Sequence, residues 1–587
     1  MQSFFAVARR DEERWDERLL DATASELARW LTYAEHVTAQ RAIASRCGRV
    51  ALFAFTNEPR LTIVEERGLV LAVSGYSTAA AQLLDARPDH TLFRQLTELP
   101  GRFAAALFDP GAGRIAAASS VVAVDPLYHG RTDQMAVVGT QASAIAGLLH
   151  GELRVDPGGL FSFINTGFFG SRDTAFEDVT CLPPASTWTV EDGVEHRTHR
   201  SLADLKRAAR GAAPRHRLAD DFTAAVREMA GAAPISLGLT GGRDSRILLA
   251  GALRAGLEVD CYTDDSGEWC ASDVYVARLL AARLGVPHRV VKSAAPGSGA
   301  PSDGPIDPLR LAASTLRATD AGMYLYDSHD LETRFHPVAA LRGYAGGLLR
   351  GGYAVKHKDL TRARAHEIAR AQFGRQHRYF RDDVRDRYFD FLDDWMADFD
   401  DDLGPHDLLE CLYADFRCGR WVAAQTRALG LAARDFTPFL DNRLALTTIS
   451  LPAEEKTRGA VGRELLRALW PGALEVPLAN NLFPGTTAAA AQALKREHPE
   501  AFRPWRSLAL ATDWRRAFPD FFVDHIRAYC LDQGRLDLLR DAMQVDEVAR
   551  FLREGATAFR EGSNMKFVHG LYSACVLASG DWLATAR

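Results

Sequence analysis

The chain has 587 residues, which is enough for several domains of ordinary size. Its composition, 47% hydrophobic and 25% charged, is typical of a globular protein and excludes a disordered or fibrous chain. The net charge of −6 argues against a general nucleic-acid or membrane-surface binder. Eight scattered cysteines without a CxxC pair, no signal-peptide pattern and no long apolar run predict reduced thiols, a cytoplasmic location and no membrane span.

The first 205 residues are predicted to be rich in strands. Short apolar runs separated by glycine, aspartate and proline turns indicate strands at Val50–Phe55, Leu69–Val73, Phe103–Phe108 and Met135–Val138. Helical patterns intervene at 140–149 and 157–163. This mixture favours an α+β sandwich.

A basic, polar stretch at 206–217 is interpreted as the link between two domains, 1–205 and 206–587. After a helix at 218–230, expected strands at 235–239, 257–263 and 288–291 alternate with expected helices at 245–255 and 272–284. Such alternation predicts βαβ units and a parallel sheet. From about residue 305 to the end, helical periodicity dominates.

The strongest chemical signal is the segment Thr240–Ser245, Thr-Gly-Gly-Arg-Asp-Ser, which follows the first of these strands. Glycines allow close approach of the backbone, and the amino end of the next helix offers N–H groups to phosphate oxygens. Thr240 and Ser245 add hydroxyl donors, and Asp244 is the candidate ligand for Mg²⁺. The Gly-Lys-Ser/Thr ending of a Walker A loop is absent. The segment therefore predicts a site for a nucleotide's pyrophosphate, with a structural strand-turn-helix corner as the alternative.

Thr240–Ser245 resembles the S-G-G-x-D-S pyrophosphate loop of the asparagine synthetase-like, N-type ATP pyrophosphatases. Segments at 273–288, 343–353, 437–443 and 450–467 also resemble that family, in the family's order. The resemblance covers about 220–485 and implies a PP-loop α/β domain with helical additions that cleaves ATP, with Mg²⁺, to AMP and pyrophosphate. The residues it implies at the nucleotide are Leu237, Leu239, Thr240, Gly241, Gly242, Arg243, Asp244, Ser245, Thr263 and Gly343.

The N-terminal half resembles the family's glutaminase domain, an Ntn-hydrolase-like α+β sandwich, at 101–109, 125–128 and 182–184. That domain uses an N-terminal cysteine as its nucleophile. Position 2 is Gln2, so we expect a degenerate glutaminase domain and an amine that comes from another substrate rather than from glutamine.

The segment 347–353 departs from the family's D-E-L-F-G-G-Y pattern because its acidic pair is missing, which argues against simple asparagine synthesis. Tyr344 falls where β-lactam synthetases place a catalytic tyrosine, and Glu410 is its candidate partner in accepting the amine's proton. Lys456 or Arg463 would supply the cation that stabilises the oxyanion and the leaving phosphate. A packed aromatic ring, a helix carboxylate and exposed helix charges are the structural alternatives.

Two relatives without an ammonia supply are the lasso-peptide cyclases and the β-lactam synthetases. The first is favoured here, which implies macrolactam formation in a ribosomal precursor peptide, with a leader peptidase and a leader-binding (RRE) protein as partners. The alternatives are a β-lactam or other small-molecule amide synthetase and an inactive peptide-binding scaffold. Two Arg-Tyr-Phe triplets on an expected helix are candidates for a peptide groove, or else core aromatics with solvated arginines: Arg378, Tyr379, Phe380, Arg387, Tyr388 and Phe389.

Overall fold

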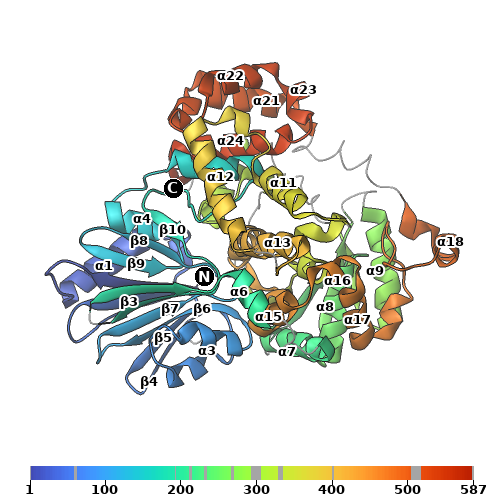
Figure 1. The fold of residues 1–587 in the computed structure, drawn as a ribbon, viewed down its shortest axis with the longest axis horizontal. Helices are drawn as coiled ribbons and strands as arrows, with labels where there is room; N and C mark the ends of the chain where they lie inside the picture. The colour runs from blue at the N-terminus through green and yellow to red at the C-terminus, as the bar shows by residue number, and fades with distance from the viewer. Residues whose placement is uncertain are drawn as a thin grey trace.

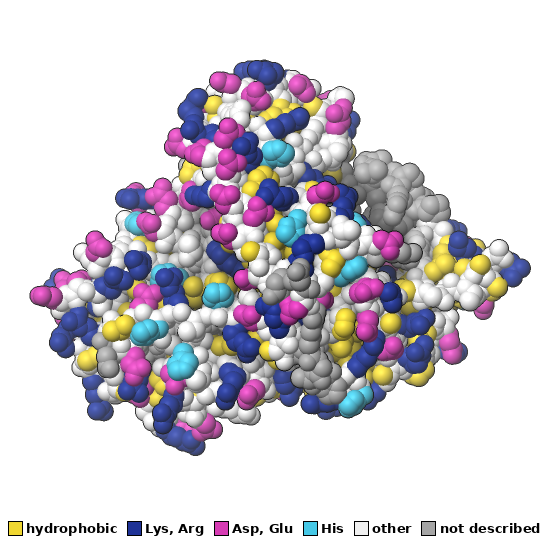
Figure 2. Space-filling model, in the orientation of Figure 1, with side chains coloured by type: hydrophobic (Ala, Val, Ile, Leu, Met, Phe, Trp, Pro, Cys, Tyr) yellow, Lys and Arg dark blue, Asp and Glu magenta, His cyan; other side chains and the backbone are white. Residues whose placement is uncertain are grey.

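The computed structural model describes residues 2–58, 62–191, 193–209, 215–230, 234–265, 270–292, 306–327, 335–357, 359–399, 402–503 and 517–584. A sheet-rich N-terminal domain lies beside an α/β domain, and the C-terminal helices form a third, helical part of the molecule (Figure 1). Among the helices that the structure describes, none combines the length and the apolar character needed to cross a membrane. On the face shown in Figure 2, basic and acidic side chains are interspersed over all three parts.

The N-terminal domain contains two antiparallel sheets of six strands, stacked face to face. Alternate residues of each strand point into the layer between the sheets, where Phe4, Leu52, Ala106 and Trp188 are buried. The first sheet has the order β10-β8-β9-β1-β3-β2 and the second β12-β11-β7-β6-β5-β4. The strands are β1 (Gln2–Arg9), β2 (Ala39–Ala44), β3 (Val50–Thr56), β4 (Ile63–Glu66), β5 (Leu69–Tyr76), β6 (Arg102–Asp109), β7 (Arg114–Ala118), β8 (Tyr128–Arg131), β9 (Met135–Gly139), β10 (Val179–Cys181), β11 (Ser186–Glu191) and β12 (Val194–His199).

Helices cover the outer faces of this pair of sheets. The helices α1 (Glu17–Trp30) and α4 (Ala142–His150) pack on the first sheet, and α3 (Leu92–Glu98) packs on the second. Their apolar stripes meet strand residues that point away from the central layer, such as Phe53 and Leu71. The predicted α+β sandwich is confirmed as an arrangement of sheets and helices.

The second domain is built on a five-stranded parallel sheet with the order β15-β14-β13-β16-β17. Its central strand is the one that leads into Thr240–Ser245. The order reverses at β13, because β14 follows on one side and β16 on the other, and ligands of open α/β sheets bind beyond the carboxyl ends of the strands at such a reversal. The strands are β13 (Ile235–Gly238), β14 (Val259–Asp264), β15 (His288–Val291), β16 (His336–Leu341) and β17 (Ala433–Phe436).

Two of these strands, β16 and β17, lie in the part of the chain after about residue 305, where helical periodicity dominates and the sequence predicts no strand. They have six and four residues, and periodicity does not separate so short an apolar run from a turn of buried helix. The surrounding helices are α7 (Leu218–Ala230), α8 (Arg243–Arg254), α9 (Ala271–Leu284), α10 (Pro308–Ala318), α14 (Ala423–Leu429), α15 (Asn442–Ser450), α16 (Ala453–Thr457), α17 (Ala460–Leu469) and α18 (Ala488–Glu497).

The remaining helices form the third part and its connection to the sheet. They are α5 (Phe161–Thr166), α11 (Arg362–Phe373), α12 (Asp382–Ala397), α13 (Pro405–Leu412), α21 (Asp520–Arg527), α22 (Val545–Glu554), α23 (Ala556–Arg560), α24 (Asn564–Ala578) and α25 (Asp581–Ala584). A π-helical stretch, Tyr413–Val422, joins α13 to α14. Helix α24 packs on α5, which comes from the first 205 residues of the chain, so the C-terminal helices contact the N-terminal part of the sequence.

The predicted link at 206–217 is only partly a link. Residues 202–209 form helix α6 (Leu202–Ala209), while 210–214 lie outside the described residues. Lys206, which begins this predicted basic link, is buried in α6, where its ammonium group pairs with carboxylates of α13.

Candidate functional site

The turn from β13 into α8 is closed by hydrogen bonds between its own residues. The backbone N–H of Thr240 donates to Ser245 Oγ at 3.1 Å, and the two hydroxyls lie 3.0 Å apart. The N–H of Gly242 donates to Thr240 Oγ1 at 3.2 Å. Thr240 and Ser245 therefore shape the turn as well as offering hydroxyl groups to a ligand.

A second anchor comes from α9. The N–H of Gly241 donates to Asp273 Oδ1 at 2.7 Å, and burial raises the pKa of that carboxyl while this hydrogen bond lowers it. A Cβ on Gly241 would lie 2.4 Å from Ala479 Cβ, so a glycine is required there for the 478–481 segment to approach. The loop is thus fixed between α9 and a segment more than two hundred residues further along the chain.

Asp244, the predicted metal ligand, forms an ion pair with Arg350. The carboxylate also lies against Gly346, where an added Cβ would come 2.6 Å from either carboxylate oxygen, while a Cβ on Gly343 would lie 3.2 Å from the Asp244 Cβ. Gly347 follows in the segment where the sequence lacks its acidic pair. Among the described residues no group of three or more His, Cys, Asp or Glu side chains could hold a metal ion.

This donor set does not fit a divalent cation held by side chains, because it offers one carboxylate and a guanidinium already occupies it. The metal role predicted for Asp244 is therefore not supported by the geometry of its side chain.

The surroundings of Asp244 are cationic instead. Arg243, Arg350 and Arg463 line one small cavity with Asp244, between α8, the 346–350 turn and α17. The pKa of Arg243 is lowered, first by burial and then by the nearby charge of Arg350. Arg463 donates to Pro484 O at 3.0 Å, while its Nε has no hydrogen-bond partner among the described residues. Three guanidinium groups that line one cavity beside Asp244 give this end of the turn a positive charge that suits an anion such as a phosphate.

Four other residues predicted at the nucleotide surround this loop. Leu237 and Leu239 are buried and contribute only backbone at the end of β13. Thr263 Oγ1 donates to Leu239 O at 2.6 Å, which ties the end of β14 to β13. Gly343 contacts Asp244. The structure brings the predicted nucleotide residues together, and their role in binding remains a prediction.

Tyr344 follows β16 and comes directly after Gly343, which contacts Asp244. Its ring packs edge-on against Trp421 at 5.8 Å, and the guanidinium of Arg417 lies 3.5 Å from the centre of that tryptophan. Burial raises the pKa of Tyr344, with Arg342 opposing the shift. The phenol is therefore neutral near pH 7 and can donate a hydrogen bond, but it is a weak proton acceptor.

The predicted pairing of Tyr344 with Glu410 is wrong. Glu410 is completely buried and pairs with two lysines, Lys206 at 2.7 Å and Lys456. Lys456 is also completely buried and donates to Thr448 O at 2.6 Å. Neither Glu410 nor Lys456 has a surface that a substrate could reach, so their predicted catalytic roles are wrong as well. The three groups form a structural ion cluster that ties α6, α13 and α16 together.

The predicted peptide groove is wrong for Tyr379, Phe380 and Tyr388, because these rings are buried in the core of the helical part. Tyr379 stacks on Phe567 at 4.9 Å, and Tyr388 donates to Gly170 O at 2.9 Å. The first triplet spans a single short 3₁₀ turn rather than a helix face.

The other three residues of the triplets are more exposed. Arg387 lies 3.7 Å from Asp156, Arg378 stacks on its neighbouring tyrosine and Phe389 is partly buried. For Arg378, Arg387 and Phe389, a role in substrate binding stays a prediction.

Sequence reasoning missed Arg350 and Arg246 as parts of this site. Arg246 follows the loop and is buried, donating to the carbonyls of Ala473, Val476 and Pro477 at 2.7 Å each. Burial lowers its pKa to about 9, and no carboxylate opposes that shift. An arginine directly after Asp-Ser on an otherwise apolar helix face was the available signal. Nothing in the sequence indicated Arg350, because its partner, Asp244, lies 106 residues away along the chain.

Comparison with known proteins gives one match to a family model and two distant likenesses in structure. Residues 217–480 match the family model described as asparagine synthase. No curated protein matches the chain. The glutamine phosphoribosylpyrophosphate amidotransferase from B. subtilis, complexed with ADP and GMP, is 12% identical over 58% of this chain and 75% of its own, with a TM-score of 0.22.

A second solved structure, of the allosteric regulatory enzyme of purine biosynthesis, is 12% identical over 50% of this chain and 81% of its own, also with a TM-score of 0.22. At this sequence identity and TM-score, neither likeness supports a conclusion about the fold or function of this chain. The family match, in contrast, begins just before α7 and contains the loop, Arg350, Tyr344 and Arg463. It suggests ATP-dependent amide-bond formation in general, and it supports the asparagine synthetase-like family for residues 217–480 of this chain.

Proposed function

We propose that the chain is an AMP-forming carbon–nitrogen ligase that closes a macrolactam in a ribosomal precursor peptide. The observation that carries the proposal is the glycine turn at the carboxyl end of β13, with Arg243, Arg350 and Arg463 lining a small cavity beside Asp244 of that turn. That arrangement fits the polyphosphate of ATP, and the family match points to amide formation.

In the proposed first step, a side-chain carboxylate oxygen of the peptide attacks the α-phosphorus of ATP. The bond from that phosphorus to the bridging oxygen of the β-phosphate breaks, and pyrophosphate leaves. Arg243, Arg350 and Arg463 would neutralise the charge that grows on the leaving group, because they line the cavity beside the turn.

In the second step, the amino group of the same peptide attacks the acyl carbon. The bond from that carbon to the AMP oxygen breaks, AMP leaves and the nitrogen loses a proton. Tyr344, a neutral phenol directly after Gly343, would donate a hydrogen bond to the developing oxyanion.

The cavity between the two domains supports a source of amine other than glutamine. The described residues that line it include Gln2 and Ser3 of β1 and no cysteine. A thiol is the nucleophile that an Ntn-type glutaminase needs there. The amine would therefore arrive on the substrate, as in a cyclisation.

The test is to incubate the protein with ATP, Mg²⁺ and a leader-free precursor peptide that has a free amino terminus. We expect the peptide to lose one water by mass spectrometry and AMP to accumulate. Arg463→Met should slow AMP formation by about tenfold or more, the effect of losing one charge-assisted contact. The matched control, Arg254→Met at the other end of α8, should keep the wild-type rate.

Two other outcomes separate the remaining candidates. AMP formation with a small amino acid instead of a peptide would favour a β-lactam or other small-molecule synthetase. No AMP with any substrate and no binding of ATP would favour an inactive scaffold, a reading to which the Asp244–Arg350 ion pair lends support.

A further inference from the structure

The π-helical stretch Tyr413–Val422 has one face that is only partly buried. Tyr413, Arg417 and Trp421 form this face, and the other seven residues of the stretch are buried. The three side chains are four residues apart, about one turn of a π-helix, so they line up on the same side. π-Helices are rare and occur frequently at functional sites, which makes this face a candidate for contact with a ligand.

The face packs against the glycine-rich segment that follows β16. At one end, the ring of Tyr413 lies 5.3 Å from that of Tyr353, and a Cβ added to Gly347 would come within 2.5 Å of the Tyr413 hydroxyl. At the other end, Trp421 packs edge-on against Tyr344. Because the same segment contacts the turn after β13, this face lies beside the candidate nucleotide site.

Arg417, in the middle of the face, has no hydrogen bond or ion pair with any residue that the structure describes. Its guanidinium carbon lies 3.5 Å from the centre of the Trp421 ring and 5.6 Å from that of Phe168. The indole is itself held in place, because its Nε1 donates to Asp327 Oδ2 at 2.8 Å. Stacking leaves the N–H groups at the rim of the guanidinium able to donate. A partly buried, stacked cation without a partner indicates an anionic ligand.

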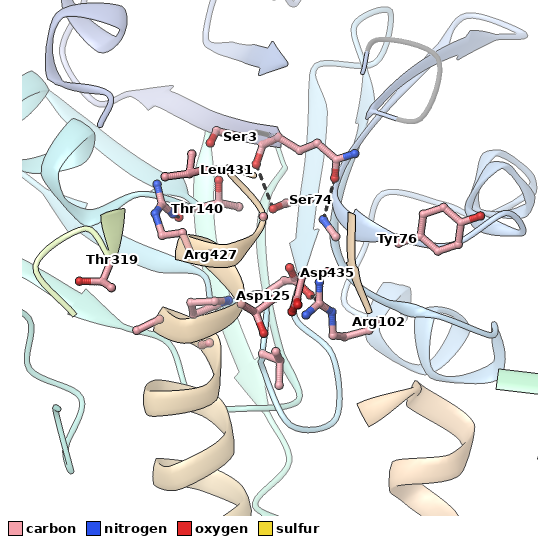
Figure 3. Close-up of a pocket in the computed structure, with 18 of the residues that line it drawn as sticks. Ser3, Ser74, Tyr76, Arg102, Asp125, Thr140, Thr319, Arg427, Leu431 and Asp435 are labelled. Atoms are coloured by element: carbon pink, nitrogen blue, oxygen red, sulfur yellow. Dashed lines mark hydrogen bonds and ion pairs between the residues drawn. The ribbon is translucent and has the colours of Figure 1, made fainter. Parts of the chain in front are cut away.

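The second arginine of the stretch is engaged in a different way. Arg420 is buried, donates to Asp173 O at 2.7 Å and lines the cavity between the two domains. That cavity has Asp125 and Asp435 on its wall (Figure 3), and none of the three partly exposed side chains belongs to its lining. The two sides of the stretch therefore face different places, and of its two arginines Arg417 alone lacks a partner among the described residues.

The anion that suits this position is a carboxylate. The cavity beside Asp244 already offers three arginines to phosphate groups, and Arg417 does not line it. Instead, Arg417 shares Trp421 with Tyr344, the phenol proposed to stabilise the acyl oxyanion. A planar guanidinium matches a carboxylate with two parallel hydrogen bonds.

We propose that Arg417 binds a carboxylate of the substrate, with Trp421 as the platform that holds the guanidinium. In the proposed reaction this carboxylate is the one that is adenylated, so its fate rests on the proposed function, whereas its binding needs no ATP. When the carboxylate oxygen attacks the α-phosphorus, the acyl group loses its negative charge and its ion pair with Arg417. Arg417 therefore stabilises the bound substrate more than the transition state.

A ligand-observed NMR titration of the full chain without nucleotide tests the binding. The probes are the α-amides of N-acetylaspartate and N-acetylglutamate, whose side-chain carboxylate is their only charge. The corresponding asparagine and glutamine derivatives are the neutral controls. We expect the two acids to bind and the controls to fail, and the tighter acid identifies the length of the acidic side chain. Equal binding of acids and controls, or no saturation by either acid in the millimolar range, overturns the proposal.

Variants locate the site. Arg417→Met should weaken binding of the acids about tenfold or more, the effect of losing charge-assisted hydrogen bonds. Arg417→Lys keeps the charge without the planar fork, so its affinity should lie between those of the wild type and Arg417→Met. Arg29→Met is the matched control, because Arg29 also stacks on a tryptophan, Trp30, at 4.7 Å on α1. Wild-type affinity in Arg417→Met, or an equal loss in Arg29→Met, contradicts the assignment.

Exchange of labelled pyrophosphate into ATP separates this inference from the proposed function. The amino group of each acid probe is blocked, so the reaction stops at the adenylate. Arg417→Met should raise the KM for the acid about tenfold, while kcat and the KM for ATP change by less than about twofold. An equal rise in the KM for ATP would place the anion with the nucleotide and overturn the inference.

The two proposals fail in different ways. Exchange with an unchanged KM for the acid in Arg417→Met would retain the ligase function and refute the role of Arg417. Binding of the acids through Arg417 without any exchange in the wild type would retain the carboxylate site and refute the ligase function.

Discussion

Replacing Glu410 by glutamine should destabilise the protein without any direct effect on chemistry. Glu410 is completely buried between Lys206 at 2.7 Å and Lys456, and both lysines are themselves buried. At an effective dielectric constant of about 20, one such pair attracts by about 6 kcal/mol before the cost of desolvation. Glutamine keeps the shape of the side chain and removes the charge.

The variant leaves two buried ammonium groups with Asp407 as their nearest remaining carboxylate, 3.0 Å from Lys206. Breaking a buried pair by removing one partner costs about 3–5 kcal/mol, and we expect a loss of this size. The pKa of Lys456, which burial lowers to about 8 against the opposing charge of Glu410, should fall further.

Urea unfolding followed by circular dichroism measures the loss, with Glu454→Gln as the control. Glu454 forms an exposed i,i+4 pair with Arg458, so its replacement should change the free energy of unfolding by less than about 0.5 kcal/mol. A loss below about 1 kcal/mol in Glu410→Gln would refute the structural reading of the cluster. A folded, stable and inactive Glu410→Gln variant would restore the catalytic reading.

Three further predictions concern the loop and the two domains. Arg350→Met should weaken ATP binding about tenfold in a fluorescence titration, because the variant removes one cation from the cavity proposed to hold the phosphates. Tighter binding of ATP with Mg²⁺ would show instead that Arg350 blocks a metal at Asp244. Arg246→Met should lower the free energy of unfolding by about 3 kcal/mol, because three buried carbonyls at 473–477 lose their hydrogen-bond donor. Urea unfolding measures this loss, and a value below about 1 kcal/mol would contradict the prediction. The raised pKa of Asp125 favours the folded state below about pH 4, and this contribution is lost as the pH rises through about 6. Wild-type stability should therefore fall by about 3 kcal/mol relative to Asp125→Asn over that range, and parallel pH profiles would contradict it.

The local features of this protein could be predicted from the sequence. The turn at Thr240–Ser245 and the strands and helices around it depend on neighbouring residues, because glycine conformations, helix starts and apolar periodicity act over a few positions. The sandwich of the N-terminal domain follows from the same short-range alternation. Strands β16 and β17 were missed, because four to six residues carry too little periodicity.

Only the tertiary structure decided which charges meet. Arg350 reaches Asp244 across 106 residues, and Lys206, Glu410 and Lys456 converge from three helices. The cavity at Asp125 and Asp435 exists because two domains close on each other. A sequence shows that a residue is charged, but whether the charge faces solvent, a substrate or a buried partner depends on packing between distant segments. For this reason the turn at Thr240–Ser245 could be predicted, whereas its ion pair with Arg350 and the burial of Glu410 could not.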